Sequence, residues 1–356
     1  MIDRDTVSGQ NTSGEYLQIA SPTTGHPGTP VRPGIPAPMG NDGAADLWVI
    51  VLAGGQGVRL QGFVRYILGT ERPKQFCRFI GRRTMLRHTW DRALRLVDPA
   101  RSVTIITAGQ EPYLEEEAPR SVPGTLLVQP DNRETAPGLL LPLLWIARRS
   151  PAATVVVFPA DHFIWEEARF MDHVWGAVRT ARARADRLTL VGVEADGPEM
   201  DYGWILPGDP LRAEPADNVF AVRRFWEKPD RQTAVHLFTR GSLWNTMILA
   251  GRLEAYLGLV TAQLPWMVDP VEAVVDCVGV PGKTRTAAAV YSRIPPTNFS
   301  RAILAPCAAQ LIVLAARGVT WSDSGDADRI LRTLRRFDRR PAWWPVDATA
   351  LAAGRI

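Results

Sequence analysis

The chain has 356 residues, 46% of them hydrophobic, so it can bury a substantial core in one large domain or two modest ones. Its net charge is only +4 and its arginines are interspersed with acidic residues, which argues against nucleic-acid binding. Because it has no uninterrupted apolar run of about 18 residues and no N-terminal hydrophobic signal region, we expect a cytoplasmic protein without a membrane span.

The cysteines and lysines indicate which kinds of binding site the chain can form. Cys77, Cys277 and Cys307 are odd in number and widely spaced, with no Cys-x-x-Cys pair, so they predict reduced, partly buried thiols and neither disulfides nor a zinc site. Of the 41 basic residues only three are lysines, among them Lys74 and Lys228. A compact ammonium suits a phosphate where a planar guanidinium would not fit, so these lysines are candidates for phosphate contacts, with chance as the alternative.

The first segment, residues 1–45, is rich in Pro, Gly, Ser and Thr and lacks hydrophobic periodicity. Such a composition cannot bury enough apolar surface to offset the entropy cost of ordering, so it predicts a disordered extension. Its sequence indicates no particular role.

A strand is predicted at residues 47–53, followed at once by glycines. The run is continuously apolar, without the alternation of a half-exposed strand, and predicts a central parallel strand covered on both faces. Gly54, Gly55 and Gly57 allow a sharp turn with bare N–H groups, which can bind an anion. Three cations follow closely: Arg59, Arg72 and Lys74. The loop suits a nucleoside triphosphate, and a tight structural turn with ordinary surface cations is the alternative.

Two well-known phosphate-binding loops are excluded. No Gly-Lys-Ser/Thr triplet follows the glycines, as a Walker loop requires. Leu60 stands where a dinucleotide-binding fingerprint has its third glycine.

The loop instead resembles a known family. Leu52-Ala53-Gly54-Gly55-x-Gly57-x-Arg59-Leu60, followed by Pro73-Lys74-Gln75-Phe76, is similar to the start of the sugar-nucleotide pyrophosphorylases, and Pro-Lys-Gln-Phe resembles their mannose-1-phosphate guanylyltransferase branch. The family has Trp-Pro-Leu-Ser after Arg-Leu, where this chain has residues 61–64. The resemblance implies catalytic roles for Arg59 and Lys74. It also implies that the nucleotide is bound by Leu52, Ala53, Gly54, Gly55 and Gly57.

Helices and strands alternate over the next hundred residues. Thr84 is the predicted N-cap of a helix that extends to Val97, and further helices are predicted at about 136–149 and 166–185. Strands are predicted at 102–107, 125–129, 153–158 and 188–193. Strands separated by helices predict a mostly parallel sheet with helices on both faces, whose ligands bind beyond the carboxyl ends of the strands.

The strand at 125–129 ends in Gln-Pro-Asp-Asn-Arg-Glu-Thr-Ala-Pro. The residues alone predict a polar turn in which Thr135 caps the next helix. In the guanylyltransferases the corresponding stretch ends in Asn-Thr-Ala-Pro and lies against the nucleobase, so the resemblance implies a base pocket formed by Gln129, Arg133 and Thr135. Glu134 stands where the family commonly has Asn.

The strand at 153–158 leads into Pro-Ala-Asp161-His162. A carboxylate at the end of a buried parallel strand lies in the ligand crevice and suits Mg²⁺, and a cap for the next helix or turn is the alternative. The motif matches a family motif whose Asp is a metal ligand, so the resemblance implies that Asp161 binds Mg²⁺. His162 is expected to be a supporting or structural residue, because a hard cation does not favour imidazole. Trp-Ser-Asp323 resembles the family segment that completes the metal site, so Asp323 is the second predicted ligand and Asp326 a lesser candidate.

The pattern changes after residue 195. Extended segments at 201–205 and 219–226, without a long helix between them, predict a small mixed lid over the sheet edge. Taken singly, Glu-Lys-Pro at 227–229 indicates a surface pair and Trp244 a core residue. Together, Tyr-Gly, Glu-Lys-Pro and Trp-Asn resemble the family's sugar-phosphate site and imply roles for Gly203, Glu227, Lys228 and Asn245. The family has Trp-Asn-Ser-Gly, whereas here Thr246 is followed directly by Met247.

The resemblance covers about residues 47–334 and implies an α/β fold. We expect a Rossmann-like α/β/α sandwich, the nucleotide-diphospho-sugar transferase fold. The predicted domains are an extension at 1–45, a nucleotidyltransferase domain at 46–336 with a nucleotide-binding half at 46–195 and a sugar-phosphate half at 196–336, and a short tail at 337–356.

The implied reaction joins GTP and mannose 1-phosphate to give GDP-mannose and pyrophosphate, with Mg²⁺ as cofactor. Positioning and charge neutralisation carry such a transfer without a strong base. The resemblance implies no nucleic-acid or membrane partner and is compatible with a homodimer. The alternatives are a nucleotidyltransferase for another sugar or base, a non-catalytic nucleotide-sugar sensor, and a glycosyltransferase of related fold, whose usual Asp-x-Asp pair is absent at Asp161.

Overall fold

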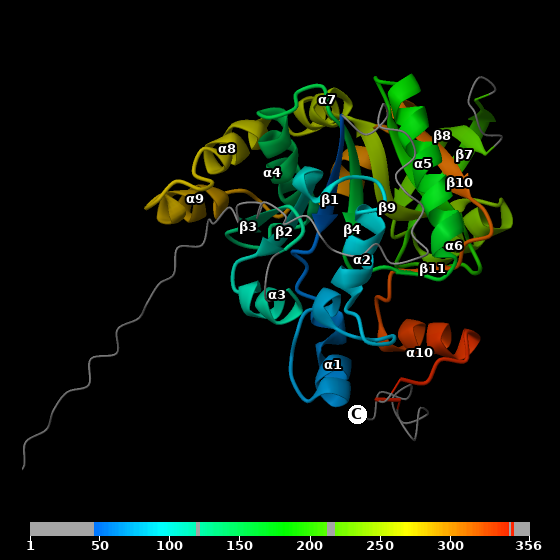
Figure 1. The fold of residues 1–356 in the computed structure, drawn as a ribbon. Helices are drawn as coiled ribbons and strands as arrows, with labels where there is room; N and C mark the ends of the chain where they lie inside the picture. Colours follow the sequence, from blue (N-terminus) through cyan, green and yellow to red (C-terminus); the bar gives the residue numbers. More distant parts are fainter. Residues whose placement is uncertain (1–45, 119–121, 212–217, 342, 345–356) are drawn as a thin grey trace, which may run out of the picture.

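The computed structural model describes residues 46–118, 122–211, 218–341 and 343–344. At its centre is a nine-stranded mixed sheet with helices on both faces (Figure 1). The predicted extension at 1–45 and the tail from residue 345 onward lie outside the described residues. In spatial order the strands are β3 (Thr125–Gln129), β2 (Ser102–Thr107), β1 (Leu47–Leu52), β4 (Thr154–Pro159), β9 (Leu243–Arg252), β6 (Leu188–Glu194), β10 (Leu311–Ala316), β8 (Val219–Glu227) and β7 (Gly203–Pro210).

Strand β1 occupies the middle of the parallel half of the sheet. It pairs in parallel with β2 on one side and with β4 on the other. Trp48 and Ile50 belong to one hydrophobic core, whereas Leu47, Val49 and Val51 belong to the core on the opposite face. Both faces of β1 are therefore covered, which confirms the interpretation of its continuous apolar run.

The other half of the sheet corrects two expectations. The sheet is mixed rather than mostly parallel, because β9 runs antiparallel to β4 and β6, and β8 runs antiparallel to β10. The segment expected to form a small mixed lid over the sheet edge is instead the β7–β8 hairpin, which belongs to the sheet itself, and Trp204 of β7 also pairs with Trp244 of β9. The short connection between β7 and β8 favours antiparallel pairing, since a parallel pair needs a long crossover.

Helices cover the two faces of the sheet separately (Figure 1). The core on one face is completed by α4 (Thr135–Ala147), α7 (Leu253–Gln263), α8 (Pro265–Val275) and α9 (Thr284–Tyr291). The core on the other is completed by α2 (Met85–Ala93), α3 (Glu111–Glu117), α5 (Glu167–Ala183) and α6 (Arg231–Thr239). Helix α4 is buried along almost its whole length, as a helix that is apolar all round must be.

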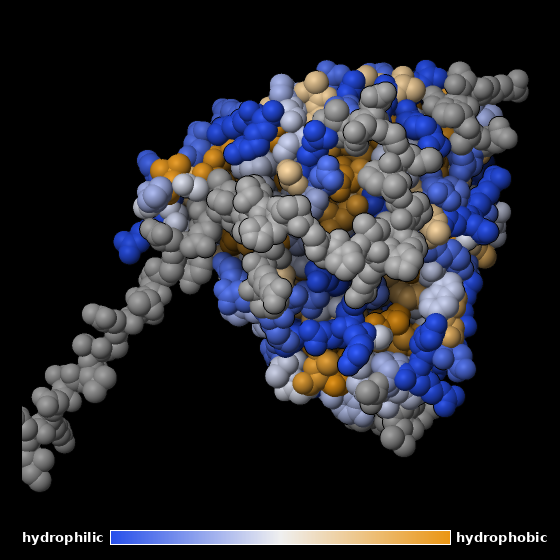
Figure 2. Space-filling model, in the orientation of Figure 1, coloured by the Kyte–Doolittle hydropathy of each residue, from blue (hydrophilic) through white to orange (hydrophobic). Residues whose placement is uncertain are grey.

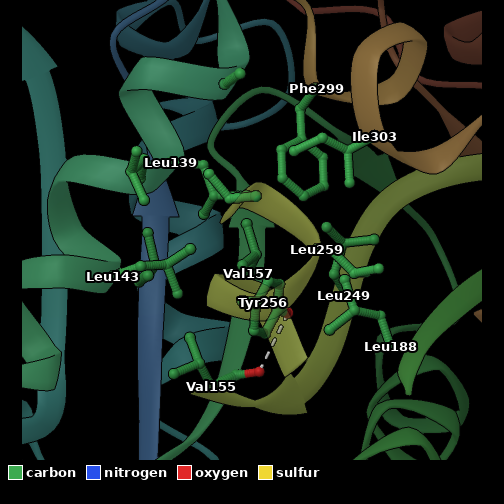
Figure 3. Close-up of a cluster of buried hydrophobic side chains, with 14 of the residues drawn as sticks. Leu139, Leu143, Val155, Val157, Leu188, Leu249, Tyr256, Leu259, Phe299 and Ile303 are labelled. Carbon is green, nitrogen blue, oxygen red and sulfur yellow. Dashed lines mark hydrogen bonds between the residues drawn. The ribbon is translucent and has the colours of Figure 1, made fainter. Parts of the chain in front are cut away.

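Figure 3 shows how distant segments meet in the core beneath α4. Tyr256 of α7 donates a hydrogen bond to the carbonyl of Val155 in β4 at 3.4 Å. Phe299 lies between α4 and α7 with 1% of its surface exposed, and it precedes a π-helical turn (Ser300–Leu304). Phe299 therefore anchors a late segment of the chain against the parallel half of the sheet.

A third, smaller cluster lies outside the two main cores. It joins α1 (Gln61–Leu68) to α10 (Ala327–Arg336) through Phe63, Val64 and Leu334. Trp343 completes it by packing edge-on against Phe63 at 5.7 Å. The face shown in Figure 2 is mostly hydrophilic, with several hydrophobic patches, one of which lies over α1. Residues 61–64, where the family has Trp-Pro-Leu-Ser, thus open a helix that is fixed by this cluster.

The two predicted helix caps have different outcomes. Thr84 accepts a hydrogen bond from the backbone N–H of Arg87 at 3.1 Å, which confirms it as the N-cap of α2. The prediction for Thr135 is wrong, because Thr135 is the first residue of α4 and its hydroxyl accepts a hydrogen bond from the backbone N–H of Phe299 at 2.8 Å. A tertiary contact has replaced the local cap.

The cysteines among the described residues bear out the prediction of buried, unpaired thiols. Cys77, Cys277 and Cys307 are all buried and free. Within the described ranges, no helix combines the length and the apolar character that a bilayer span requires.

We expect Phe299→Ala to destabilise the protein by about 3–5 kcal/mol, because it empties a fully packed site in the core. Phe238→Ala is the matched control, since Phe238 is 39% exposed, and it should change stability by less than about 0.5 kcal/mol. Urea unfolding followed by circular dichroism measures both. Equal losses for the two variants would contradict the assigned core.

Candidate functional site

Side chains from later in the sequence hold the loop after β1. Gln75 donates hydrogen bonds to the carbonyls of Ala53 (2.5 Å) and Gly55 (2.8 Å), and Thr107 donates to the carbonyl of Gly54 (2.8 Å). The backbone N–H groups of residues 54–57 donate to no other described residue. Since the carbonyls are engaged and the N–H groups are not, the loop can offer its N–H groups to an anion.

Two of the loop glycines are required by close packing. Gly57 has a φ of +62°, and a Cβ there would lie 3.0 Å from the backbone nitrogen of Lys74. A Cβ on Gly54 would lie 2.6 Å from Nε2 of Gln129 and 3.0 Å from Oγ1 of Thr107. The loop therefore fits directly between the ends of β2 and β3 and the Pro-Lys-Gln-Phe turn.

A pocket of about 370 Å³ opens beside this loop, and we call it the loop pocket. Its wall includes the predicted residues Leu52, Gly54, Gly55, Gln129, Thr135 and Asp161. The sequence interpretation missed Asn132, Glu134 and Gly138, which also line it. Asn132 and Glu134 lie inside the polar segment singled out after β3, so their position in that segment was the available signal.

Both ends of the amide of Gln129 are engaged within the protein. Its Nε2 donates to Thr107 at 2.8 Å, and its Oε1 accepts from the hydroxyl of Tyr291 at 2.9 Å. Nδ2 of Asn132, in contrast, has only one hydrogen-bond partner among the described residues, the carbonyl of Gly54 at a long 3.4 Å. Gln129 therefore fixes the pocket wall, and Asn132 has the more available amide donor.

A second pocket of about 140 Å³, here called the hairpin pocket, adjoins the first. The predicted residues Gly203, Glu227, Asn245 and Asp323 line it. Thr135, His162 and Met247 line both pockets, so the two share a boundary. The sequence interpretation did not assign Met247 a role, and it also missed Tyr202, Asn298, Ser300 and Trp321, which contribute to the hairpin pocket.

A short strand pair brings the two predicted metal ligands together. β5 (Phe163–Ile164) follows Asp161, and it pairs antiparallel with β11 (Trp321–Ser322), which precedes Asp323. Lys74 lies between them: its Nζ is 2.8 Å from the carboxylate of Asp161 and donates a short hydrogen bond to the backbone carbonyl of Asp323. Two aspartates far apart in sequence are thus joined by one buried ammonium.

Burial and the neighbouring Lys74 determine the protonation states of Asp161 and His162. Burial by itself raises the pKa of Asp161, but the charge and the hydrogen bond of Lys74, together with smaller neighbouring effects, outweigh it and hold the pKa below its ordinary value. Burial lowers the pKa of His162 to about 4, against the opposing effect of Asp161. Nδ1 of His162 accepts a hydrogen bond from the indole N–H of Trp321 at 3.2 Å, as a neutral imidazole can. The site therefore presents an ionised Asp161 and a neutral His162 near neutral pH.

Arg329 of α10 holds Asp323 from the other side. Its guanidinium lies 3.2 Å from Asp323, 3.0 Å from Glu199 and 3.1 Å from Asp201, with 6% of the side chain exposed. Asp326 caps α10 by accepting from the backbone N–H of Arg329 at 2.8 Å, which gives this lesser metal candidate a structural role. Arg329 was missed because nothing in its local sequence distinguishes it from the many other arginines.

Six predicted site residues lie outside both pocket walls: Ala53, Gly57, Arg59, Lys74, Arg133 and Lys228. Arg59 is exposed and lies 3.4 Å from Asp201, which itself lines the hairpin pocket. Arg133 pairs with Asp131 at 3.0 Å. Lys228 has a positive φ of 51°, and its backbone N–H donates to the carbonyl of Tyr202 at 3.2 Å.

The donor atoms near Lys74 fit a hard cation. Asp161 is about a third exposed in the pocket wall, and Oδ2 of Asp323 has only a 3.5 Å contact with Arg329. Mg²⁺ commonly takes one or two protein carboxylates and completes its shell with phosphate oxygens and water. In the described part of the chain, no group of three or more His, Cys, Asp or Glu side chains could hold a metal. The residues fit an ion that takes its other ligands from substrate and water.

Comparison with known proteins places the chain in a family. The sequence pattern of the family described as nucleotidyl transferase matches residues 48–336. The chain belongs to the nucleotidyl transferase family. This confirms the resemblance inferred from the glycine loop and the Pro-Lys-Gln-Phe segment, and it accounts for the α/β fold with its mixed sheet.

Two curated members of the family illustrate the degree of similarity. The xanthan biosynthesis protein XanB of Xanthomonas campestris pv. campestris (strain B100) is 29% identical over 297 residues, which cover 81% of this chain and 59% of XanB. The mannose-1-phosphate guanylyltransferase of Escherichia coli (strain K12) is 30% identical over 288 residues, which cover 78% of this chain and 58% of that enzyme. The chain therefore spans about three fifths of the length of these relatives.

A solved structure supports the fold of this family member. A protein of Thermus thermophilus, described as mannose-1-phosphate geranyltransferase, superposes with a TM-score of 0.67 at 24% identity and covers 83% of this chain and 80% of its own. At this identity the likeness concerns the fold alone.

We expect Arg329→Met to destabilise this nucleotidyl transferase by about 3–5 kcal/mol, because it leaves a cluster of partly buried carboxylates without their shared cation. Arg332→Met is the matched control on the same helix, since Arg332 is 62% exposed and, among the described residues, forms an ion pair only with Glu199, at 3.4 Å. The control should change stability by less than about 1 kcal/mol. Urea unfolding at neutral pH measures both, and similar small changes would show that Arg329 does not hold this region together.

Proposed function

We propose that this chain transfers a nucleotidyl group from a nucleoside triphosphate to a sugar 1-phosphate, with GTP and mannose 1-phosphate as the first substrates to test. The observation that carries the proposal is the pair of adjoining pockets, one lined by Asp161 and the other by Asp323, the two residues that Lys74 joins. The similarity to mannose-1-phosphate guanylyltransferases supports this choice of substrates.

The loop pocket would hold the nucleotide. Free N–H groups at residues 54–57 suit the triphosphate, and Thr135, Asn132 and Gln129 surround the position expected for the base. Because the amide of Gln129 is engaged within the protein, base selection would depend mainly on Asn132 and on backbone groups of the same turn. Glu134, which has a positive φ of 64°, would add a carboxylate able to accept a hydrogen bond from a base donor.

The hairpin pocket would hold the sugar. Glu227 and Asn245 offer a carboxylate and an amide to sugar hydroxyls, and Gly203 lets the backbone approach closely. Burial raises the pKa of Glu227, against the opposing charge of Lys228. Lys228, at the end of β8, would bind the 1-phosphate.

The chemistry needs no strong base. A sugar 1-phosphate is already an anion near neutral pH. One of its oxygens would attack the α-phosphorus in line, a new P–O bond would form, and the bond to the β-phosphate would break with its electron pair leaving on pyrophosphate. Lys74 would stabilise negative charge on the reacting phosphates, and Arg59 at the rim would assist with the leaving pyrophosphate. Asp161 and Asp323 would hold Mg²⁺, which when bound supplies further charge neutralisation.

The direct test is pyrophosphate release by the wild-type protein with Mg²⁺, using four nucleoside triphosphates crossed with mannose, glucose and fucose 1-phosphates. The proposal expects turnover with GTP and mannose 1-phosphate. Ligand binding without turnover of any pair would favour the non-catalytic alternative, and consumption of GDP-mannose with an acceptor would favour a glycosyltransferase.

The scarcity of lysine allows a complete set of lysine variants: Lys74, Lys228 and Lys283. We expect Lys74→Ala to lower kcat by about 10²–10³-fold, because it removes a preorganised charge from the reacting phosphates. Lys228→Ala should act mainly on the KM for the sugar phosphate. Lys283→Ala is the matched control, since Lys283 is exposed beside α9, outside both pockets. Near-normal turnover by a folded Lys74→Ala variant would remove this mechanism.

A further inference from the structure

Met247 adopts an unusual backbone conformation in β9. The strand bulges there: Leu249 pairs with Leu190 and Asn245 pairs with Gly192, so β9 has more residues than β6 between the two pairs. Met247 has a φ of +54°. This left-handed region is disfavoured for residues with a Cβ, and glycine is the residue that adopts it freely.

Neighbouring side chains hold this conformation in place. Oδ1 of Asn245 accepts a hydrogen bond from the backbone N–H of Met247 at 3.1 Å. Thr246 donates to the carbonyl of Val191 at 2.6 Å and accepts from the backbone N–H of Ile248 at 3.2 Å. Bonds on both sides of Met247 therefore fix the bulge, and strain held in this way is characteristic of functional positions.

The side chain of Met247 lies at the boundary between the loop pocket and the hairpin pocket, since it lines both. Its sulfur lies 3.0 Å from Oγ of Ser300, which is also a hydrogen-bond partner of Glu227. The hairpin pocket is small, about 140 Å³, and Met247 forms part of its wall. A sugar that fills this pocket would therefore pack against the side chain of Met247.

We propose that Met247 determines which sugar 1-phosphate this chain accepts. The proposal rests on the proposed function and adds a substrate class to it. The sulfur of Met247 is a weak acceptor that already accepts a hydrogen bond from the hydroxyl of Ser300, so a sugar would meet its methyl and methylene groups. A sugar hydroxyl buried against those groups would lose its hydrogen bonds to water, whereas a C–H group packs well against them. The favoured substrates are thus sugar 1-phosphates that present C–H instead of a hydroxyl towards Met247, such as deoxyhexose 1-phosphates, and a fully hydroxylated hexose 1-phosphate is a poorer substrate.

The test compares wild type, Met247→Ala and Met247→Gly with mannose, fucose and 2-deoxyglucose 1-phosphates. In wild type we expect kcat/KM for at least one deoxy sugar to exceed that for mannose 1-phosphate by about tenfold or more. Both variants should raise kcat/KM for mannose 1-phosphate by about tenfold and remove the preference, because a small pocket difference changes discrimination by that order. A ratio that stays within about twofold of wild type in both variants overturns the proposal. Met200→Ala, at a residue 48% exposed, is the control and should leave every ratio unchanged.

Two further measurements keep this proposal separate from the proposed function. Calorimetric titration with each sugar 1-phosphate ranks the three sugars by affinity and does not require turnover. If no combination of nucleoside triphosphate and sugar 1-phosphate is turned over, the proposed function is refuted, and the affinities still test the role of Met247. An unchanged affinity ranking in both variants then overturns that role.

At an ordinary strand position glycine is less stabilising than alanine. A melting temperature of Met247→Gly at or above that of Met247→Ala is therefore expected from the left-handed backbone, and a clearly lower one contradicts the argument from strain.

Discussion

A single buried ammonium is the constraint that shapes the whole site. Lys74 is only 7% exposed, and a charge so far removed from water needs charged or polar partners. Those partners are Asp161, beyond the end of β4, and the carbonyl of Asp323, 249 positions away in the sequence. The chain must fold back on itself to satisfy one lysine. Asp161 lines the loop pocket and Asp323 lines the hairpin pocket, so this fold also places the two pockets next to each other.

The antiparallel strand β9 of the mixed sheet brings further residues to the site. Because β9 runs antiparallel to β4, its first residues lie at the same edge as the last residues of β4. Asn245 and Met247 therefore reach the edge at which the parallel strands deliver the glycine loop and Asp161. Backbone strain is also concentrated near the site. Most of the described non-glycine residues with a positive φ lie in or beside the site motifs, namely Glu134, Lys228, Met247 and Ser324.

Local sequence patterns predicted the strands of the parallel half almost to the residue. Runs such as Ser102–Thr107 and Thr125–Gln129 depend on short-range hydrophobic patterning, which the structure reproduces. The same patterning could not show that the segment after residue 200 joins the main sheet, since strand partners are chosen by long-range packing. Thr135 failed as a cap for a related reason, because a tertiary bond to Phe299 uses its hydroxyl.

The amino-acid sequence alone was enough to establish the family, the glycine loop and the motifs that supply Lys74, Asp161 and Asp323, because each is a short run whose chemistry depends on adjacent residues. The folded chain was needed to show that Arg329 holds Asp323, that residues 61–64 begin a helix, and that Met247 lies in a left-handed bulge between two pockets. These features depend on contacts between segments far apart in the chain. The spacing of residues along the sequence does not predict such contacts, since they form only when the whole sheet is assembled.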